Sequence, residues 1–567
     1  MLGTNGTFNR ILGTGAGQVQ WTGAAVALGG FSAEGGDLTV TLNNDAATPL
    51  VWGTTAGFNP GSVVLGGPFA TGTTTLTNNI DLSTATTAIA RTLVTQAGTS
   101  VVSGVISNTG AAQGVLVIEG NGTASGTMVF SNANTYGGTT QIDTGGQGAA
   151  TARATNSLAF GTSTILFNPG GNASTARLEL ANNINLANNV TFTGRGNNSV
   201  GIENVSGNNT MSGTLSVTSG GGTWTVQSDA GSTLNLTGAA ATASAPGVAV
   251  TSVATGTRGI TLQGDGTGTV TGIIQTGSAT TFNFNKAGLG TWTLTNANTF
   301  NGATAVNAGT LQLGDGTTGH DGTIANTTGV TVASGATLAY NRFGTSSAGY
   351  VITGAGGVSK LGAGTQTLTA ANTYTGTTTV QAGTLSLTTP AQAVVLTGGG
   401  ADVRGGKLVL DYTGGSSPVA SVKSILDAGY AGNFATGQIK GTTLAANRTL
   451  GYGDSGTAVT IRVTLAGDAD LDGDVDFNDF LVLQSKFGQA NTRFDEANFN
   501  YDGFTDFNDF LALQANFGQS VTGDEVAFTS AQVAAMTAFA SVVPEPASLT
   551  LIGMGAAGLL GRRRSRS

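Results

Sequence analysis

Residues 290–300 read GTWTLTNANTF, and residues 364–374, 74 positions further along, read GTQTLTAANTY. In the first copy the apolar side chains of Trp292 and Leu294 alternate with threonines. A period of two is typical of a strand with one buried face, whereas a helix would show a period near 3.6. The stretch therefore predicts a short strand followed by an asparagine-containing turn.

The same pattern continues in both copies and recurs once more. The continuations are VNAGTLQL at 306–313 and VQAGTLSL at 380–387, and a third copy at 126–136, GTMVFSNANTY, loses the pattern after Gly145. Units this small cannot bury an apolar face alone, so they must stack on neighbours, at roughly 20 residues a coil. We expect a parallel β-helix over residues 1–394, with an array of β-sandwiches as the alternative.

Side chains at equivalent positions of the copies carry two further expectations. Asn298 and Asn372 are placed to pair with their equivalents on adjacent coils. The aromatic residues Tyr136, Phe300 and Tyr374 are expected to pack at the corners of the coils, and exposure of these rings would instead indicate glycan binding.

The three copies resemble the autotransporter-associated β-strand repeat of bacterial surface passengers. That resemblance implies a parallel β-helical stalk. The composition agrees with many short strands joined by glycine turns, because 92 of 567 residues are glycine and only 9% are charged.

The negative charge is concentrated in one segment. Residues 467–526 contain thirteen acidic and two basic residues, a balance of −11 in a chain whose net charge is −9. No basic stripe accompanies it, so nucleic acid is not an expected partner. The chain has no cysteine, which excludes disulfides, thiol nucleophiles and cysteine-bound metals.

Between 395 and 466 the sequence texture changes. Pro418, Val419, Val422, Ile425 and Leu426 fit one face of a short helix, and Val459 to Leu465 alternates as a strand. A small α+β cap that covers the open end of the β-helix is therefore expected here.

Two acidic loops follow, at 468–479 and 498–509. In the first, oxygen-bearing side chains occupy loop positions 1, 3, 5, 9 and 12, with Gly473 at position 6, which is the calcium-loop spacing. Position 12 is Asp479 and not the usual glutamate. Both loops lead into near-identical helical segments in which Phe480, Leu483 and Phe487 have the spacing of a buried face.

Two loop-then-helix units resemble a type I dockerin, a calcium-dependent module that binds cohesin domains. The resemblance implies calcium as cofactor and a ligand set in which Asp474 and Phe504 use backbone carbonyls; the ligands are Asp468, Asp470, Asp472, Asp474, Asp476, Asp479, Asn498, Asn500, Asp502, Phe504, Asp506 and Asp509. Loop positions 10 and 11, a Ser-Thr pair in many dockerins, are Phe477-Asn478 and Phe507-Asn508 here, which puts cohesin binding in doubt.

The last twenty-four residues have three parts in order: Pro-Glu-Pro, an uncharged stretch of fifteen residues from Ala547 to Gly561, and an arginine cluster. Fifteen helical residues span about 22 Å, less than a bilayer core, which suits a transient anchor or a buried helix. The tail resembles the PEP-CTERM sorting signal read by exosortase-type enzymes; the residues that carry the resemblance are Pro544, Glu545, Pro546, Arg562, Arg563 and Arg564.

Sorting implies export, with the arginines cytoplasmic before processing. The segment Met1 to Gly6 has no basic region and no apolar stretch after it, so we expect a signal peptide upstream of a truncated or misassigned start. The expected location is the cell envelope or the outside of the cell, with a C-terminal membrane segment.

No catalytic set stands out, because the single histidine, His320, lies in a glycine-rich turn. We therefore expect an exported, non-catalytic structural or adhesive protein whose partners are an exosortase-type enzyme and a cohesin-like protein or an extracellular glycan. A polysaccharide-active or polysaccharide-binding β-helix protein is the alternative, and two carboxylates facing each other in a groove would favour it.

The expected fold class is mainly β: a right-handed parallel β-helix, a small α+β cap, a small α-helical module of the EF-hand, dockerin-like type, and an apolar sorting helix. The expected parts are a repeat region at 1–394, a cap at 395–466, a calcium module at 467–520, a spacer at 521–543 and the sorting signal at 544–567.

Overall fold

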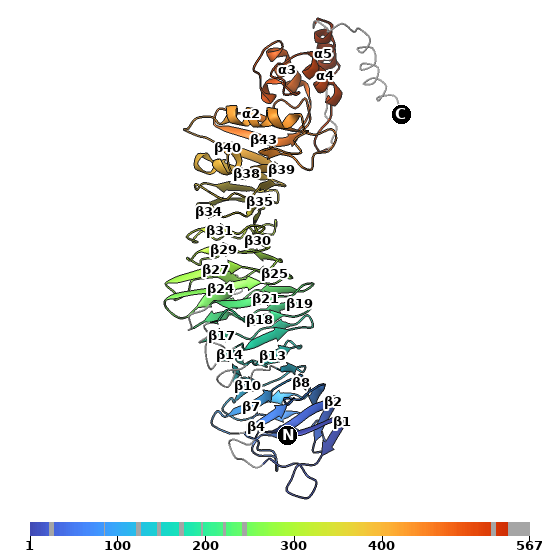
Figure 1. The fold of residues 1–567 in the computed structure, drawn as a ribbon, viewed down its shortest axis with the longest axis vertical. Coiled ribbons are helices and arrows are strands. Elements are labelled where there is room, and N and C mark those ends of the chain that lie inside the picture. The colour runs from blue at the N-terminus through green and yellow to red at the C-terminus, as the bar shows by residue number, and fades with distance from the viewer. Residues whose placement is uncertain are drawn as a thin grey trace, which may run out of the picture. The chain divides into compact units, whose positions relative to one another are not determined.

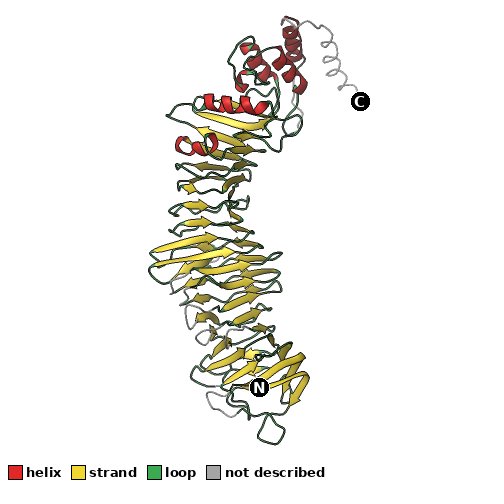
Figure 2. Ribbon diagram, viewed as in Figure 1, coloured by secondary structure: helices red, strands yellow, loops and turns green. Residues whose placement is uncertain are grey.

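The computed structural model describes residues 1–21, 28–83, 85–120, 126–143, 149–168, 175–193, 197–218, 223–240, 246–522 and 529–542. Contacts between residues divide the chain into two compact units, Met1–Leu338 and Ala339–Ser567. Most of the described secondary structure is strand, and the helices gather near the C-terminus (Figure 2).

Unit 1 consists of short strands. They are β1 (Leu2–Arg10), β2 (Leu28–Leu42), β3 (Leu50–Val51), β4 (Ser62–Leu65), β5 (Thr73–Leu76), β6 (Ile80–Asp81), β7 (Ala90–Thr95), β8 (Thr99–Val102), β9 (Ile106–Ser107), β10 (Val115–Gly120), β11 (Thr127–Phe130), β12 (Thr139–Asp143), β13 (Thr151–Ala154), β14 (Thr164–Asn168), β15 (Arg177–Leu180), β16 (Asn185–Leu186), β17 (Val190–Phe192), β18 (Val200–Asn204), β19 (Asn208–Met211), β20 (Leu215–Val217), β21 (Trp224–Ser228), β22 (Thr233–Leu236), β23 (Val248–Ser252), β24 (Thr257–Gln263), β25 (Thr267–Val270), β26 (Ile273–Ile274), β27 (Thr281–Lys286), β28 (Thr291–Leu294), β29 (Thr304–Val306), β30 (Thr310–Leu313) and β31 (Val330–Val332), with β32 (Thr337–Asn341) at the boundary between the units.

These strands stack in columns, each strand pairing in parallel with its counterpart one coil further along the chain (Figure 1). One column runs through β13, β15, β18, β21, β24 and β27. A second runs through β14, β17, β20 and β23, and a third through β19, β22, β25, β28 and β30. Parallel pairing in successive coils confirms the mainly-β, parallel-sheet prediction, and it differs from the antiparallel sheets of a sandwich.

The core lies inside the coils, where apolar side chains of successive coils stack on one another. Trp292 pairs with Leu311 and Leu294 with Leu313, and all four are fully buried. Each such aliphatic side chain stabilises the fold by about 2 kcal/mol through burial. The coils are less uniform than the expected 20 residues, because Gln227 pairs with Gln263, 36 residues on.

The asparagines of the repeats do not pair with one another as expected. Asn298 accepts a hydrogen bond from the backbone N–H of Ile274 (2.9 Å) and donates one to the carbonyl of Thr323 (3.1 Å). Asn372 likewise accepts from Ile352 (2.8 Å). Backbone groups at the corners need partners where the ladders stop, so each asparagine joins neighbouring coils through the backbone.

The equivalent aromatic residues lie in the core, as expected for corner packing. Tyr136, Phe300 and Tyr374 are at most 1% exposed, so these rings are not available to a glycan. The two tyrosine hydroxyls are hydrogen-bonded at 2.7 Å to Thr140 and Thr378.

A buried lysine in two of the repeats was not predicted from sequence. The Lys286 ammonium donates to the carbonyls of Ala287, Gly288 and Ala308 at 2.8–3.0 Å, and burial lowers its pKa to about 8. Lys360 occupies the equivalent place and donates to Gly362 and Ala382. Each lysine thus joins the carbonyls of two coils.

Unit 2 begins with stacked strands and ends with helices. Its strands are β33 (Thr345–Ala348), β34 (Ile352–Thr353), β35 (Gly357–Leu361), β36 (Thr365–Leu368), β37 (Thr378–Val380), β38 (Thr384–Thr388), β39 (Ala401–Val403), β40 (Lys407–Asp411), β41 (Ile439–Lys440), β42 (Thr449–Asp454) and β43 (Ala458–Thr464). Its helices are η1 (Thr389–Ala391), α1 (Ala393–Leu396), α2 (Val419–Tyr430), α3 (Phe477–Lys486), η2 (Phe494–Glu496), α4 (Phe507–Asn516) and α5 (Ser530–Val542).

Strand pairing changes direction in the middle of unit 2. β33, β36, β38 and β40 pair in parallel, after which β43 joins β40 and β42 joins β43, both antiparallel. The helix expected from Val422 and Leu426 is α2, and both side chains are fully buried. The antiparallel hairpin closes an edge at which another coil would otherwise add.

Candidate functional site

The first acidic loop folds into a tight turn around its own carboxylates. Asp470 Oδ1 accepts from the N–H of Asp472 (3.1 Å), and Asp472 Oδ1 accepts from that of Asp474 (2.8 Å). Gly473 has φ of 109°, a conformation that favours glycine. As a result, carboxylate oxygens of Asp468, Asp470 and Asp472 lie within 4.8 Å of one another.

The end of this loop is tied to its beginning through helix α3. Asp476 is the N-cap and forms a capping box with Asp479. Asp479 Oδ1 also accepts from the N–H groups of Ala469 (2.7 Å) and Asp470 (3.2 Å). Position 12 therefore organises the loop through backbone bonds, and a carboxylate retains lone pairs for a further partner.

The second loop repeats this geometry almost bond for bond. Asp509 Oδ1 accepts from Phe499 (2.7 Å) and Asn500 (3.2 Å), and Asp506 forms the capping box of α4. Gly503 has φ of 90°. The second loop thus has the same backbone shape as the first, in which Asp468, Asp470 and Asp472 are brought together.

The two loops are paired through the ends of their helices. The N–H of Val475 donates to Gln519, after α4 (2.9 Å), and the N–H of Thr505 donates to Gln489, after α3 (3.1 Å). Val475 and Thr505 both occupy loop position 8. The reciprocal bonds make the loop–helix units a single body in which each loop supports the other.

Position 1 of each loop holds a buried oxygen without a hydrogen-bond partner among the described residues: Asp468 Oδ1 and Asn498 Oδ1. An unsatisfied buried acceptor is costly, so each of these two oxygens needs a partner that supplies a donor or positive charge. Burial also raises the pKa of Asp468 to about 7, of Asp479 to about 8 and of Asp509 to about 7. The donors are all oxygens, so the set fits a hard divalent cation such as calcium.

Both loops pack on the preceding α+β segment of unit 2, which sequence reasoning missed. Tyr501, at position 4 of the second loop, is buried against Tyr430, Phe434 and Tyr452, and its hydroxyl donates to the Leu450 carbonyl. In the first loop the equivalent Leu471 lies against β42, where a side chain at Gly451 would collide with it. The sequence feature that could have predicted this contact is the apolar residue at position 4 of both loops.

Polar bonds extend the same contact. Arg462 in β43 donates to the carbonyl of Leu471 (2.6 Å), Arg448 donates to that of Val521 (2.9 Å), and Thr464 donates to Asp468. These bonds tie the cap to both ends of the loop–helix pair.

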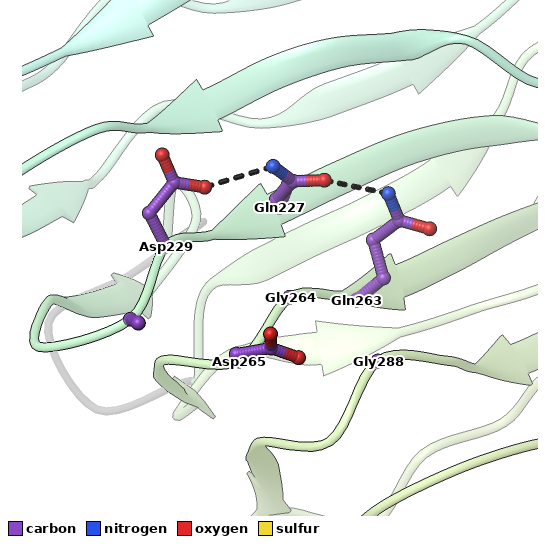
Figure 3. Close-up of a pocket in the computed structure, with 7 residues that line it drawn as sticks. Gln227, Asp229, Gln263, Gly264, Asp265 and Gly288 are labelled. Carbon is purple, nitrogen blue, oxygen red and sulfur yellow. Dashed lines mark hydrogen bonds between the residues drawn. The ribbon is translucent and has the colours of Figure 1, made fainter.

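A polar groove of about 420 Å³ lies in unit 1 (Figure 3). Gln227 and Gln263 pair in register on β21 and β24, and Asp229 and Asp265 follow these strands. Gln227 donates to Asp229 (2.8 Å) and Gln263 donates to Gln227 (2.6 Å). The groove was not predicted, because residues from three separate segments of the chain line it, and Gln227 and Gln263 lie 36 positions apart.

The groove lies beside a ladder of polar side chains on successive coils. Gln227 also donates to Glu203 (3.0 Å), which pairs with Arg177, and Arg153 donates to Glu179 (2.7 Å). Glu179 and Glu203 are buried and neutralised by these arginines. The carboxylates of the groove have no such arginine among the described residues.

His320 lies in an exposed turn, as expected. Its Nδ1 is 2.8 Å from Asp315 Oδ2, and its side chain is 50% exposed. The ring nitrogen also lies 3.1 Å from the hydroxyl of Thr317, which belongs to the same turn.

Comparison with known proteins identifies two features of the chain. Residues 125–146, 284–313 and 358–387 match the Passenger-associated-transport-repeat family, and residues 542–564 match the PEP-CTERM protein-sorting motif. No curated protein and no solved structure matches the chain. Both resemblances drawn from sequence for these segments are confirmed.

The sorting motif indicates an exported protein of the cell envelope or extracellular space, recognised by an exosortase-type enzyme. Its residues Pro544 to Arg564, including the apolar stretch expected to enter the membrane, lie outside the described residues. None of the helices in the described ranges has the length and apolar character needed to cross a membrane.

Proposed function

We propose that this protein is an exported, non-catalytic structural or adhesive component of the cell envelope, whose two acidic loops bind calcium. The observation that carries the calcium assignment is the unpartnered, buried oxygen at position 1 of each loop. Calcium would supply the positive charge that these loops lack. The calcium ion in each loop would be held by the side chains at positions 1, 3, 5, 9 and 12 and by the carbonyl at position 7, which belongs to Asp474 or Phe504.

The packing of the loops supports a role as a calcium-stabilised cap of the repeat stalk. To bind a cohesin as a dockerin does, the loop–helix pair would need an exposed face for that partner. Here Tyr501 and Leu471 are occupied by the cap of the same unit, and positions 10 and 11 carry Phe-Asn pairs. Calcium would therefore act on the stability of unit 2 more than on recruitment of a cohesin-like partner.

Calorimetric titration of the full chain tests the calcium assignment. We expect heat of binding with calcium and weaker binding with magnesium, which resists dehydration into such loops. Calcium at about 100 times its Kd should stabilise unit 2 by about 2.7 kcal/mol for each occupied loop. Asp468→Ala should reduce both effects, while Asp45→Ala, at an exposed carboxylate of unit 1, serves as the matched control. Equal unfolding in chelator and calcium would contradict the assignment.

The sorting role is tested separately. Replacing Pro544, Glu545 and Pro546 with alanine should leave an unprocessed precursor in the membrane fraction. Processing of this variant at the wild-type level would contradict recognition through the motif.

A second candidate function, glycan binding, is favoured by the groove in unit 1. Its carboxylates and carboxamides are suited to hydroxyl groups, and Oε1 of Gln263 accepts no hydrogen bond from the described residues. The test is a glycan-array screen of the full chain with Asp229→Asn and Asp265→Asn, and with Asp45→Asn as control. Loss of binding in the groove variants alone supports the candidate, and release of shortened glycan would instead indicate hydrolysis.

A further inference from the structure

Helix α5 lies immediately before the sorting motif and has its own start signal. Thr529 accepts from the N–H of Gln532 (3.3 Å), and the Gln532 side chain accepts from the N–H of Thr529 (2.6 Å), which is a capping box. The helix ends at Val542, two residues before Pro544.

One face of α5 packs on the helices of the loop–helix pair. The ring of Phe539 lies 5.4 Å from that of Phe480, 5.3 Å from that of Phe487 and 5.9 Å from that of Phe510, measured between centroids. Met536 and Ala540 are also buried, whereas Thr537 and Ala538 are exposed. The three partner rings come from both halves of the pair, so α5 covers an apolar face that α3 and α4 make together.

This face is directly connected to the acidic loops. Phe480 follows Asp479 and Phe510 follows Asp509, the residues at position 12 of the two loops. Each aspartate closes its loop and belongs to the first turn of its helix. The order of the loops therefore fixes the first turns that place Phe480 and Phe510 under Phe539.

Docking of α5 also sets how far the sorting motif can extend. With α5 docked, Pro544 is within about 7 Å of the end of the helix, because two residues span at most about 3.6 Å each. With α5 released and unwound, the twenty-two residues that follow Thr522 up to Pro544 span at most about 79 Å, at about 3.6 Å each. A membrane enzyme that must take Pro-Glu-Pro into its active site would encounter the folded body in the first case only.

We propose that α5 is the resident partner of the apolar face of α3 and α4, and that its calcium-dependent docking shields the sorting motif from the exosortase-type enzyme. This inference rests on the proposed calcium binding. Loop ligation orders Phe480 and Phe510, the ordered face holds Phe539, and the held helix limits how far the motif can reach from the module.

Thiol accessibility in the full chain tests the docking step. The chain has no cysteine, so Ala540→Cys introduces a single thiol on the buried face of α5, and Ala538→Cys introduces one on the exposed face. In calcium we expect maleimide to label Cys at 540 at least about tenfold more slowly than at 538. Chelator should remove the difference, and so should adding Phe539→Ala in calcium.

Calorimetry on the same variants separates the two proposals. Calcium binding together with unchanged labelling on chelation would overturn the coupling and leave the calcium assignment intact. Absence of calcium binding would overturn both.

The shielding step is measured as the rate of processing in membranes that contain the sorting enzyme. Truncating a ring packed against three others should favour release of α5 by roughly a hundredfold. Phe539→Ala should therefore be processed faster than Thr537→Ala, and Thr529→Ala, which weakens the cap alone, should lie between them. Equal rates for Phe539→Ala and Thr537→Ala would overturn shielding.

Discussion

The two loops of unit 2 share a backbone and differ in what their side chains do. Both turn at a glycine with positive φ, both close through an aspartate at position 12, and both start a helix with an aspartate N-cap. Loop one offers five carboxylates at the side-chain ligand positions, and loop two offers three. Loop two instead inserts Tyr501 into an aromatic cluster of the cap.

This difference shows that a few positions fix the loop and leave the others free. Glycine at position 6 and aspartate at 9 and 12 determine the shape, because they supply the turn and the caps. Positions 1, 3 and 4 are then available for charge in one loop and for anchoring in the other. We infer that loop one contributes more to calcium affinity and loop two more to attachment to the cap.

The largest difference between the two loops in free energy of unfolding should appear when the side chain at position 4 is truncated. Tyr501→Ala removes a fully packed ring and should lower the free energy of unfolding of unit 2 by about 4 kcal/mol. Leu471→Ala, at the same position of loop one, should cost about 2–3 kcal/mol, since the leucine side chain is smaller than the tyrosine ring and is only half-buried. Urea unfolding of the full chain, followed by near-ultraviolet circular dichroism, measures both. A larger loss for Leu471→Ala would reverse the assignment of the anchor.

For calcium affinity, substitutions in loop one should have the larger effect and substitutions in loop two the smaller. Asp468→Ala removes a carboxylate from position 1 of loop one, and Asn498→Ala removes only an amide oxygen from loop two. We expect Asp468→Ala, or Asp472→Ala, to weaken calcium binding by roughly a hundredfold, and Asn498→Ala to weaken it less. Titration calorimetry resolves the two sites, and equal losses would show that loop charge does not set affinity here.

Sequence predicted the parts of this molecule that repeat, and it missed contacts between parts. Alternation at Trp292 and Leu294 was enough for buried strands, and the spacing around Gly473 was enough for both loops. The contact between Tyr501 and the cap joins residues about 50 positions apart, and the groove at Asp229 and Asp265 depends on how two long coils align. Neither the contact nor the groove follows from a short-range repeat of apolar residues in the sequence.

The domain boundaries and the handedness of the coil stay predictions, and so do the calcium ligands. The expected pairing between asparagines was wrong because a buried amide side chain satisfies the nearer backbone groups first. Loop position 4 carried a signal from which the contact could have been predicted, because an apolar side chain inside an acidic loop indicates a buried contact.

The response to pH should also separate the loops. In the cation-free protein, burial raises the pKa of Asp468 to about 7 and that of Asp479 to about 8, while loop two has only Asp509, at about 7. The unfolded values lie near 3.9. A raised folded-state pKa means that the folded protein binds the proton more tightly, so stability is fully present below about pH 4 and is lost as pH rises through about 8.

We therefore expect the cation-free chain to lose stability between pH 5 and pH 8, on the order of 3 kcal/mol for each of these carboxylates. Asp468→Asn should flatten this dependence more than a change at an exposed carboxylate such as Asp45. Because ligation requires the deprotonated groups, calcium affinity should rise over the same range. Thermal unfolding in chelator across this range, with calorimetry in parallel, measures both slopes; stability that increases with pH in chelator would contradict the buried carboxylates.

The smallest effects should be the same in the two loops, because they concern what the loops share. Asp476 and Asp506 accept from the N–H of Asn478 and Asn508, each at 2.7 Å, and both occupy the N-cap of a ten-residue helix. In chelator, Asp476→Ala and Asp506→Ala should each destabilise unit 2 by about 1 kcal/mol, the usual contribution of an N-cap. Replacement by asparagine should restore most of the loss, since Asn caps as well as Asp. If the two alanine variants differ by more than their uncertainty in chelator, the loops differ in backbone stability as well as in side chains, and charge and anchoring cannot account for the contrast alone.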